Sequence, residues 1–310
     1  MTTEFKNEFK TEDANSYNSV VGYFDQYTER FTSHMPEPML AAAGLKSAAR
    51  VLDVGTGTGV IALDVVKRLG QGTEVVGIDL SDGMLATAAA KARAAGLDEQ
   101  VSFLKMDAEN LDFEDESFDA VLSLYALRHF PNPDKALQEM FRVLKPGGAV
   151  VVAVGSSPSL FSKEGVVAAF RRIGSILRKS TGRELSACEF IDHLVEKHLP
   201  AREEKETTEW TEHHHGFSGS LKSLVEGAGF VNAKGFWKGQ YSKVTSAEDF
   251  WLLQMTFSSL ARKRIGQAAP EKVEALKQEF MSQCEAVLAK GGRLVYQTGG
   301  AVVAAAKPGA

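Results

Sequence analysis

The sequence predicts an α/β fold in which helices cover both faces of a parallel β-sheet. Between residues 51 and 155, short apolar runs alternate with segments whose apolar residues recur at helical spacing. The apolar runs, such as Val51–Val54 and Ala149–Val154, lack a polar face, which is typical of strands buried on both sides. A glycine-rich turn, Gly55–Gly59, joins the first strand to the first helix. Together these observations indicate parallel strands connected by helices on each side of the sheet.

Each element of this region has its own local signal. After the glycine turn, the apolar residues of 60–69 fall on one helical face. Ser81 is a suitable N-cap for the second helix, and Asn132 is a suitable N-cap for the third. Pro133 then stands in a first helical turn, where proline is favoured. We expect strands at 51–54, 74–78, 101–104, 118–124 and 149–154, and helices at 60–69, 82–96 and 133–144.

The region before the first strand is predicted to form a helical cap over residues 1–45. Residues 1–13 are polar and charged, and we expect them to be mobile. Helical spacing runs from Tyr17 to Phe31, and Met39–Leu45 fits a short second helix. Three tyrosines of the first helix are candidates for lining a substrate pocket or for ordinary packing: Tyr17, Tyr23 and Tyr27.

Residues 157–215 interrupt the alternation and are predicted to form a helical insertion that acts as a substrate lid. Its helices are expected at 161–177 and 187–199, and the charged run Arg202–Glu206 is expected to be a solvated face. The run His213–His215 invites a metal-site interpretation, but consecutive side chains diverge and no further ligand stands at a recognisable spacing. We therefore predict a solvated loop there and no metal site.

The predicted core comprises residues 46–156, and residues 216–310 are expected to complete it with additional helices. In this last region, the spacing of apolar residues and the positions of glycine distinguish helices from strands. Helices are expected at 218–229, 247–264 and 271–288, and strands at 230–238 and 294–306.

The composition argues against several classes of protein. Hydrophobic residues make up 44% and charged residues 24%, and the formal net charge is −5, so the chain has no overall electrostatic preference for nucleic acid or an anionic membrane. Cys188 and Cys284 are too few for a disulfide framework. The first residues lack a signal-peptide pattern, and no apolar run approaches membrane length. We expect a cytoplasmic protein without membrane insertion, whose oligomeric state the sequence leaves open.

The glycine turn and the acid Asp79 together predict a ligand site. Glycine lets a ligand approach the backbone closely, and a helix N-terminus follows the turn. Asp79 ends the second strand twenty residues beyond Gly59, where a carboxylate can accept hydrogen bonds from both hydroxyls of a ribose. A P-loop is excluded because no Gly-Lys-Ser/Thr follows. A nicotinamide-binding turn would need a small residue at position 60, so Val60 argues against it.

Five motifs of the predicted core resemble, in order, the successive motifs of class I S-adenosylmethionine-dependent methyltransferases. They are Asp53-Val-Gly-Thr-Gly-Thr-Gly59, Gly77-Ile-Asp79-Leu-Ser81, Met106-Asp107-Ala108, Phe118-Asp119-Ala120-Val121 and Leu144-Lys-Pro-Gly-Gly148. Leu127-Arg128-His129 is similar to the ubiquinone/menaquinone C-methyltransferase group and its small-molecule relatives. The resemblance covers about residues 45–155 and implies a Rossmann-like, seven-stranded, mostly parallel sheet with a reversed last strand. We expect residues 294–306 to supply that strand.

The resemblance also implies that S-adenosyl-L-methionine is the cofactor and S-adenosyl-L-homocysteine the product. Asp79 is expected to hold the ribose hydroxyls, with Leu80 against the adenine. Asp107 is expected to accept a hydrogen bond from the adenine amino group, beside Ala108. The residues expected next to the methionine part of the cofactor are Asp53, Gly55, Gly57, Gly59, Ser123 and Leu124.

The predicted function is methyl transfer to a small, apolar or aromatic molecule. Because the cofactor already carries the leaving group, the protein mainly has to orient the reactants in a dry pocket. A general base is needed only if the acceptor arrives protonated, and the candidates are His129 first and Tyr27 second. His129 is equally well explained as a loop histidine packed against Pro131. Two alternatives stay open: a non-catalytic cofactor-binding module with this fold, and a nicotinamide-dependent oxidoreductase.

Overall fold

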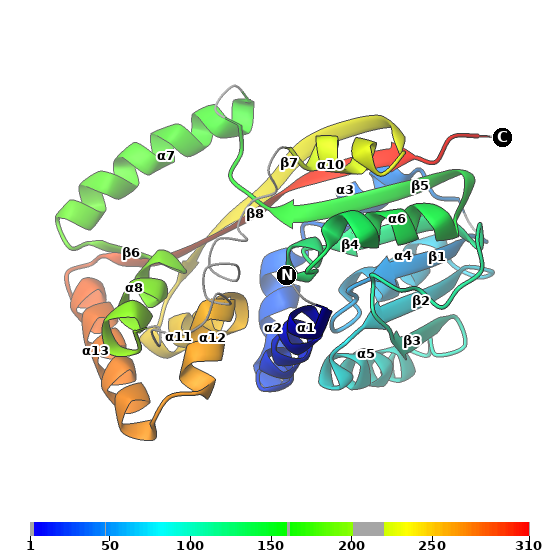
Figure 1. The fold of residues 1–310 in the computed structure, drawn as a ribbon. Coiled ribbons are helices and arrows are strands. Elements are labelled where there is room, and N and C mark those ends of the chain that lie inside the picture. Colours follow the sequence, from blue (N-terminus) through cyan, green and yellow to red (C-terminus); the bar gives the residue numbers. More distant parts are fainter. Residues whose placement is uncertain (1–2, 47, 160–161, 201–219, 310) are drawn as a thin grey trace.

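The described part of the chain folds around one mixed β-sheet (Figure 1). The computed structural model describes residues 3–46, 48–159, 162–200 and 220–309. Three predictions fall outside these ranges: the solvated run Arg202–Glu206, the loop at His213–His215 and the boundary between residues 215 and 216.

The sheet confirms the predicted Rossmann-like α/β fold. Its strand order is β3-β2-β1-β4-β5-β8-β6, and β7 also pairs with β8. Strands β1 to β5 pair in parallel, whereas β8 runs antiparallel to β5, as expected for a reversed last strand. The short strand β6 was not predicted and adds an eighth strand from the insertion. The strands are Arg50–Val54 (β1), Glu74–Asp79 (β2), Val101–Lys105 (β3), Phe118–Leu124 (β4), Leu144–Gly155 (β5), Glu184–Ser186 (β6), Val231–Val244 (β7) and Arg293–Ala306 (β8).

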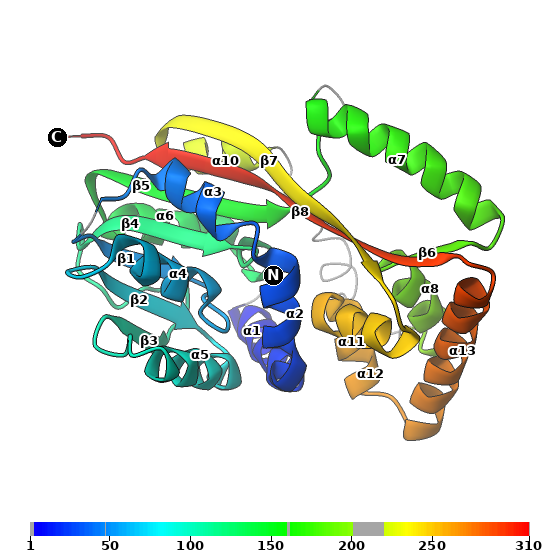
Figure 2. The ribbon, with the colours of Figure 1, turned by 180° about the vertical axis from the view of Figure 1, so that it is seen from behind.

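Helices cover both faces of the sheet, as predicted. Helices α6 and α10 pack on one face, and α3, α4 and α5 pack on the other. The remaining helices lie beside the strand ends and around the outer parts of β7 and β8 (Figures 1 and 2). The helices are Thr3–Asn18 (α1), Val21–Thr32 (α2), Pro36–Ala43 (α3), Val60–Leu69 (α4), Asp82–Ala94 (α5), Leu127–His129 (η1, 3₁₀), Pro133–Val143 (α6), Lys163–Ser180 (α7), Glu189–His198 (α8), Leu221–Gly227 (α10), Ala247–Phe257 (α11), Ser259–Gly266 (α12) and Pro270–Ala289 (α13).

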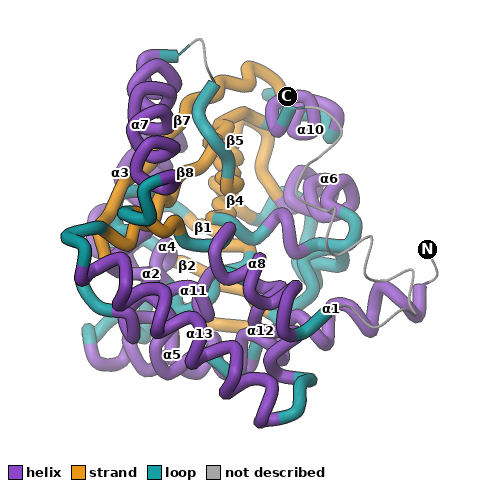
Figure 3. Tube along the Cα trace, turned by 90° about the vertical axis from the view of Figure 1, so that its left-hand side faces the viewer, coloured by secondary structure: helices purple, strands orange, loops and turns teal. Residues whose placement is uncertain are grey.

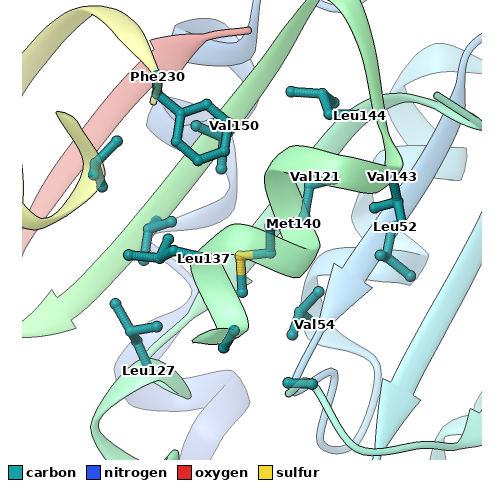
Figure 4. Packing of buried hydrophobic residues seen from close by; sticks show 14 of the residues in the cluster. Leu52, Val54, Val121, Leu127, Leu137, Met140, Val143, Leu144, Val150 and Phe230 are labelled. Carbon is teal, nitrogen blue, oxygen red and sulfur yellow. The ribbon is translucent and has the colours of Figure 1, made fainter. Parts of the chain in front are cut away.

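Strand residues alternate between two apolar layers. Leu52 of β1 faces α6, where it belongs to the same buried cluster as Leu137 and Met140 (Figure 4). Its neighbour Val51 faces the opposite layer, with Ile61 of α4. Because both faces of each central strand are buried, the strands read as continuous apolar runs in the sequence. This layering brings the carboxyl ends of β1, β2 and β4 to one edge of the sheet.

A third apolar cluster lies beyond that edge. Strands β7 and β8 extend past the parallel strands (Figures 1 and 2), and α2, α8, α11 and α13 pack around their outer parts. Figure 3 views the molecule from this end, where α8 and α13 lie in front of the sheet. Phe31, Phe250 and Phe280 are fully buried at its centre. The cluster joins the N-terminal helices to the C-terminal ones, so segments distant in sequence meet beside the strand ends.

The prediction for residues 1–13 is wrong from Thr3 onward, because these residues form most of α1. Charged side chains of α1 have partners elsewhere in the fold: Lys10 pairs with Asp107, and Asp13 pairs with Lys263. A run of charges therefore docks a helix here instead of remaining solvated.

The single helix predicted for 247–264 is also wrong, because it is two helices. The chain turns at Ser258, whose hydroxyl caps α12 by accepting a hydrogen bond from the amide of Ala261. The last strand, β8, is continuous through Gly299 and Gly300.

Candidate functional site

A large cavity opens at the carboxyl ends of the parallel strands. Its volume is about 1710 Å³, which exceeds the roughly 300–1,000 Å³ of a typical small-molecule pocket. Its walls come from the turn after β1, the ends of β2 and β4, helices α1 and α7, and strand β8. The cavity therefore has room for two ligands side by side.

The three glycines of the turn have different surroundings. A Cβ at Gly55 would lie 2.2 Å from the Cβ of Ala126, and one at Gly59 would lie 3.2 Å from Ala88. A Cβ at Gly57 would meet nothing within 4 Å. Gly55 and Gly57 line the cavity, whereas Gly59 is not among the described residues that do. Close packing against neighbouring side chains thus explains why positions 55 and 59 are glycine. Only Gly57 has free space beside it.

Asp79 locks the glycine turn to the end of β2. Its Oδ2 accepts a hydrogen bond from the amide of Gly57 at 3.0 Å, and its Oδ1 accepts one from the amide of Ser81 at 2.9 Å. Burial raises the pKa of Asp79, although these amide hydrogen bonds act against the shift. The carboxylate lines the cavity beside Leu80 and keeps lone pairs for a ligand that donates hydrogen bonds.

Asp53 is a second buried acid in the cavity wall. Its Oδ2 accepts hydrogen bonds from the Thr56 hydroxyl at 2.7 Å and the Ala62 amide at 3.2 Å. Its Oδ1 is buried and has no hydrogen-bond partner among the described residues. Burial raises the pKa of Asp53 to about 7. Such an oxygen can accept a hydrogen bond from a cationic or polar ligand group.

The loop after β3 brings a third acid to the cavity. Asp107 lies 2.7 Å from the Nζ of Lys10, which also lies 2.9 Å from Glu109. Ala108 and Leu124 line the same part of the cavity. Ser123 is not among the described lining residues, because its fully buried hydroxyl donates to the carbonyl of Val54. We call this part of the cavity the strand-end half, defined by Asp53, Gly57, Asp79, Asp107 and Leu124.

His129 lies between two side chains of α1. Its Nδ1 is 3.0 Å from the Oδ2 of Asp13, and its Nε2 is 3.1 Å from the hydroxyl of Tyr17. A neutral ring with its proton on Nδ1 satisfies both contacts, since Nδ1 then donates to the carboxylate and Nε2 accepts from the tyrosine. All three residues line the cavity. The arrangement is a carboxylate, an imidazole and a phenol connected in series.

Cations lie beside both ends of this series. Lys263 lies 2.9 Å from Asp13, and the guanidinium of Arg262 lies over the ring of Tyr17 at 4.3 Å. Burial alone would raise the pKa of Asp13, but the interactions with His129 and Lys263 outweigh it and hold that pKa well below its usual range. Burial raises the pKa of Tyr17 to about 12. Asp13 is therefore ionised and Tyr17 carries its proton at neutral pH.

Tyr27 is not brought to the cavity. Its hydroxyl donates to Asp249 at 2.5 Å, and its ring is buried in the cluster around Phe31. It is not among the described lining residues. The tyrosine that meets His129 is Tyr17, ten residues earlier on the preceding helix.

The opposite part of the cavity combines aromatic and apolar side chains with charged ones, among them Arg171, Glu184 and Arg293. The rings of Phe257 and Tyr296 stack at 5.0 Å, and Ile173 of α7 and Tyr241 of β7 also line it. We call this part the far half, defined by these four residues.

Tyr125, which follows β4 and also lines the cavity, has a φ of 61°, and its buried hydroxyl has no partner among the described residues. Positive φ at a bulky residue stores strain and often marks a functional position.

Sequence reasoning missed Lys10, Asp13 and Tyr125, and ranked Tyr27 above Tyr17. A signal was present in α1, since Lys10, Asp13 and Tyr17 are spaced by three and four residues and so share one helical face. Nothing local distinguishes Tyr125, because its strain arises only when β4 ends against β5 and β8.

The comparisons with known proteins agree with this geometry. A family model described as a methyltransferase domain matches residues 51–148. The demethylmenaquinone methyltransferase of Thermus thermophilus is 49% identical over 107 residues, which cover 34% of this chain and 47% of that protein. The ubiquinone/menaquinone biosynthesis C-methyltransferase UbiE of Proteus mirabilis is 35% identical over 169 residues, which cover 51% of this chain and 67% of that protein.

The chain spans about half the length of the first curated relatives that it matches. Among solved structures, the YcgJ protein of Bacillus subtilis is similar in fold, with a TM-score of 0.51 and 21% sequence identity. That similarity covers 90% of this chain and 100% of the other. The match to the family model lies within the predicted core, whereas the fold similarity extends over most of the chain.

Proposed function

The chain belongs to the class I S-adenosylmethionine-dependent methyltransferases, in the group of the ubiquinone/menaquinone C-methyltransferases and their small-molecule relatives, and we propose that it methylates a small apolar or aromatic molecule. The observation that carries the proposal is the hydrogen bond between Asp79 and the amide of Gly57, which joins an acid suited to bind a ribose to an open glycine turn inside a cavity with room for two ligands.

The strand-end half fits S-adenosyl-L-methionine. The space beside Gly57 is open, and any side chain at this position would fill it. A ligand that packs against bare backbone therefore requires glycine here. The partnerless Oδ1 of Asp53 suits a ligand group that donates hydrogen bonds, such as the ammonium of an amino acid. Asp79 would hold the ribose hydroxyls beside Leu80, and Asp107 with Ala108 would meet the adenine edge. Gly55 and Leu124 would flank the methionine part, with Gly59 and Ser123 supporting the turn and strand from behind.

When bound, the cofactor would supply an electrophilic methyl group on a sulfonium. The chain itself would orient the acceptor in the far half and exclude water. Tyr17 and His129 would remove a proton from the acceptor: the Tyr17 oxygen takes the proton while its own passes to the Nε2 of His129. Asp13 would stabilise the imidazolium that results.

The acceptor that suits this cavity is a quinone-type or hydroxylated aromatic molecule. The curated relatives are named for the methylation of demethylmenaquinone or for ubiquinone/menaquinone biosynthesis. The stacked rings of Phe257 and Tyr296 offer an aromatic wall, and the hydroxyl of Tyr17 offers a proton acceptor at the boundary with the strand-end half.

Calorimetry and isotope transfer together test the proposal. We expect S-adenosyl-L-homocysteine to bind and NAD not to bind. Radioactive methyl from labelled S-adenosyl-L-methionine should appear in a demethylated quinol offered as acceptor. Gly57→Ala should weaken binding strongly, since its Cβ meets no protein atom within 4 Å and would occupy the space proposed for the ligand. Because Gly57 has a φ of 54°, alanine also strains the turn, so the melting temperature is recorded beside that of Asp98→Ala, a loop substitution that serves as a control for folding.

The outcomes distinguish the proposed methyltransferase from the two alternative functions. Cofactor binding without transfer to any compound in a cell extract would identify a non-catalytic module, and NAD binding with a change in nicotinamide absorbance would identify an oxidoreductase. Normal binding by Gly57→Ala would remove the glycine turn from the site.

A further inference from the structure

Helix α7 carries an apolar face that no other described segment of the chain covers. Of the nine large apolar side chains that are exposed in the described part of the chain, six lie on α7. Phe170 is 73% exposed and Leu177 is 64% exposed. The six are Val166, Val167, Phe170, Ile173, Ile176 and Leu177.

The helix is oriented with its polar side toward the protein. Arg178 pairs with Glu184 at 2.6 Å, Ser175 also contacts Glu184, and the guanidinium of Arg171 lies over the ring of Tyr241. In an ordinary surface helix the apolar stripe faces the core, so this orientation is inverted. Figures 1 and 2 show α7 standing apart from the sheet, beside β6.

We propose that α7 is a membrane-docking helix that lies on an anionic lipid surface with its apolar face in the interface. The helix holds five basic residues and one acidic residue, whereas the whole chain has a net charge of −5. Among the described residues, no carboxylate pairs with Lys163 or Arg172, which leaves both available to lipid phosphates. An amphipathic helix with this combination of apolar and basic faces is typical of peripheral membrane binding.

Charge argues against a second copy of the chain as the occupant. Two α7 helices packed face to face would bring their basic flanks together, whereas an anionic surface attracts them. The docking is peripheral, because no helix among the described residues is long and apolar enough to cross a membrane.

The position of α7 connects the lipid surface to the cavity. Ile173 and Ile176 belong to the exposed apolar face and also line the cavity, so these two side chains connect the outside of the helix to the far half. If the proposed function holds, an acceptor dissolved in the membrane could enter the cavity beside them. The docking itself does not depend on that function.

Vesicle flotation with the full chain tests the docking. The probes are vesicles of phosphatidylcholine alone and vesicles with phosphatidylglycerol added, at low and at physiological salt. We expect the wild type to float with the anionic vesicles and to bind neutral ones on the order of tenfold more weakly. Lys163→Gln/Arg172→Gln should lose most of this difference.

The apolar contribution is tested by Val166→Ser/Phe170→Ser/Leu177→Ser, three exposed positions that do not line the cavity. Its binding to anionic vesicles should fall roughly tenfold or more. Leu104→Ser, an exposed leucine on β3, is the matched control and should bind like the wild type. Calorimetry with S-adenosyl-L-homocysteine on the same variants should show unchanged affinity, which separates failure of docking from failure of the proposed function.

Several results would overturn the proposal. They are absence of wild-type binding to anionic vesicles, equal binding to neutral vesicles, and full binding by the triple variant. A concentration-dependent dimer in sedimentation velocity that the triple variant abolishes would assign the face to a second copy instead.

Discussion

The two halves of the cavity are built in different ways. The strand-end half is mostly backbone and short acids, held by hydrogen bonds such as that between Asp79 and the Gly57 amide. The far half consists of large side chains from segments that are distant in sequence, such as Ile173, Tyr241 and Tyr296. A site made of backbone tolerates few changes, whereas a wall of side chains changes with each substitution. The cavity thus combines a restrictive half with an adjustable one, and α1 contributes Lys10, Asp13 and Tyr17 to its wall.

The largest effect is expected where the halves meet. His129→Ala should lower kcat roughly hundredfold to ten-thousandfold, because it removes the group that accepts the proton. Tyr17→Phe should act in the same direction, since it breaks the contact to Nε2. Single-turnover methyl transfer measures both variants, and calorimetry should show nearly unchanged cofactor affinity.

Tyr27→Phe provides the control for these variants. It removes a hydroxyl that contacts Asp249 and does not line the cavity, so kcat should stay close to the wild-type value. Wild-type rates in His129→Ala and Tyr17→Phe would show that the acceptor loses its proton before it binds or by another route.

The pH dependence of folding should report on Asp53 in the strand-end half. Its pKa rises from 3.8 to about 7 on burial, so the folded state holds the proton more tightly than the unfolded state. The stability that this group contributes is fully present below pH 3.8 and is lost as the pH rises through about 7. The loss amounts to about 2–4 kcal/mol in the free energy of unfolding.

Urea unfolding at pH 5 and pH 8.5 measures the part of this loss that falls between those two pH values. Asp53→Asn cannot ionise, so it should not lose this stability. Relative to the wild type, its free energy of unfolding should therefore be higher at pH 8.5 than at pH 5. A constant difference between the two proteins would mean that Asp53 titrates in its ordinary range. Saturating S-adenosyl-L-homocysteine should reduce the effect, because a donor beside Oδ1 favours the ionised form.

A smaller effect is expected for Asp79. Asp79→Ala should weaken binding of S-adenosyl-L-homocysteine roughly tenfold to several hundredfold, as for one lost charge-assisted pair of hydrogen bonds. The variant also frees the Gly57 amide, so its melting temperature should be recorded beside the calorimetry. Unchanged affinity in a folded variant would place the ribose elsewhere and would leave the restrictive half without its central acid.

The same contrast explains what the sequence could predict. Strands β1, β2 and β4 and the cap at Ser81 follow from local patterns, because their signals lie within a few residues. The glycine turn and Asp79 are close enough in sequence to be recognised together. Tyr17 and His129 are 112 residues apart, and only the docking of α1 joins them. The apolar periodicity of a single segment cannot indicate such a contact between distant residues.

Two further errors have the same origin. Residues 3–13 look solvated because Lys10 and Asp13 are charged, yet their partners lie on other elements. Tyr27 fits a helical stripe as well as Tyr17 does, and the difference depends on Asp249, which is 222 residues away. Local pattern predicts which residues form a helix, but long-range pairing decides which of its faces meets the site.

The smallest effect tests whether α1 couples the two halves. Lys10 is 13% exposed and bridges Asp107 and Glu109, which follow β3, so it ties α1 to the strand-end half. Lys10→Met keeps the aliphatic stem but leaves two carboxylates facing each other without a cation. The free energy of unfolding should fall by about 1–2 kcal/mol, less than for a fully buried pair because Asp107 is partly exposed.

The double variant Lys10→Met/Glu109→Gln should recover part of this loss, since it removes one of the unpaired charges. Lys105→Met breaks an exposed pair with Asp82 and should leave the free energy of unfolding nearly unchanged. Hydrogen exchange gives the functional readout: S-adenosyl-L-homocysteine should slow exchange in α1 of the wild type and slow it less in Lys10→Met. Equal protection of α1 in both proteins would show that the helix closes over the cavity without this bridge, so that its other contacts, such as those of Asp13, Tyr17 and Asn18, position it against the strand ends.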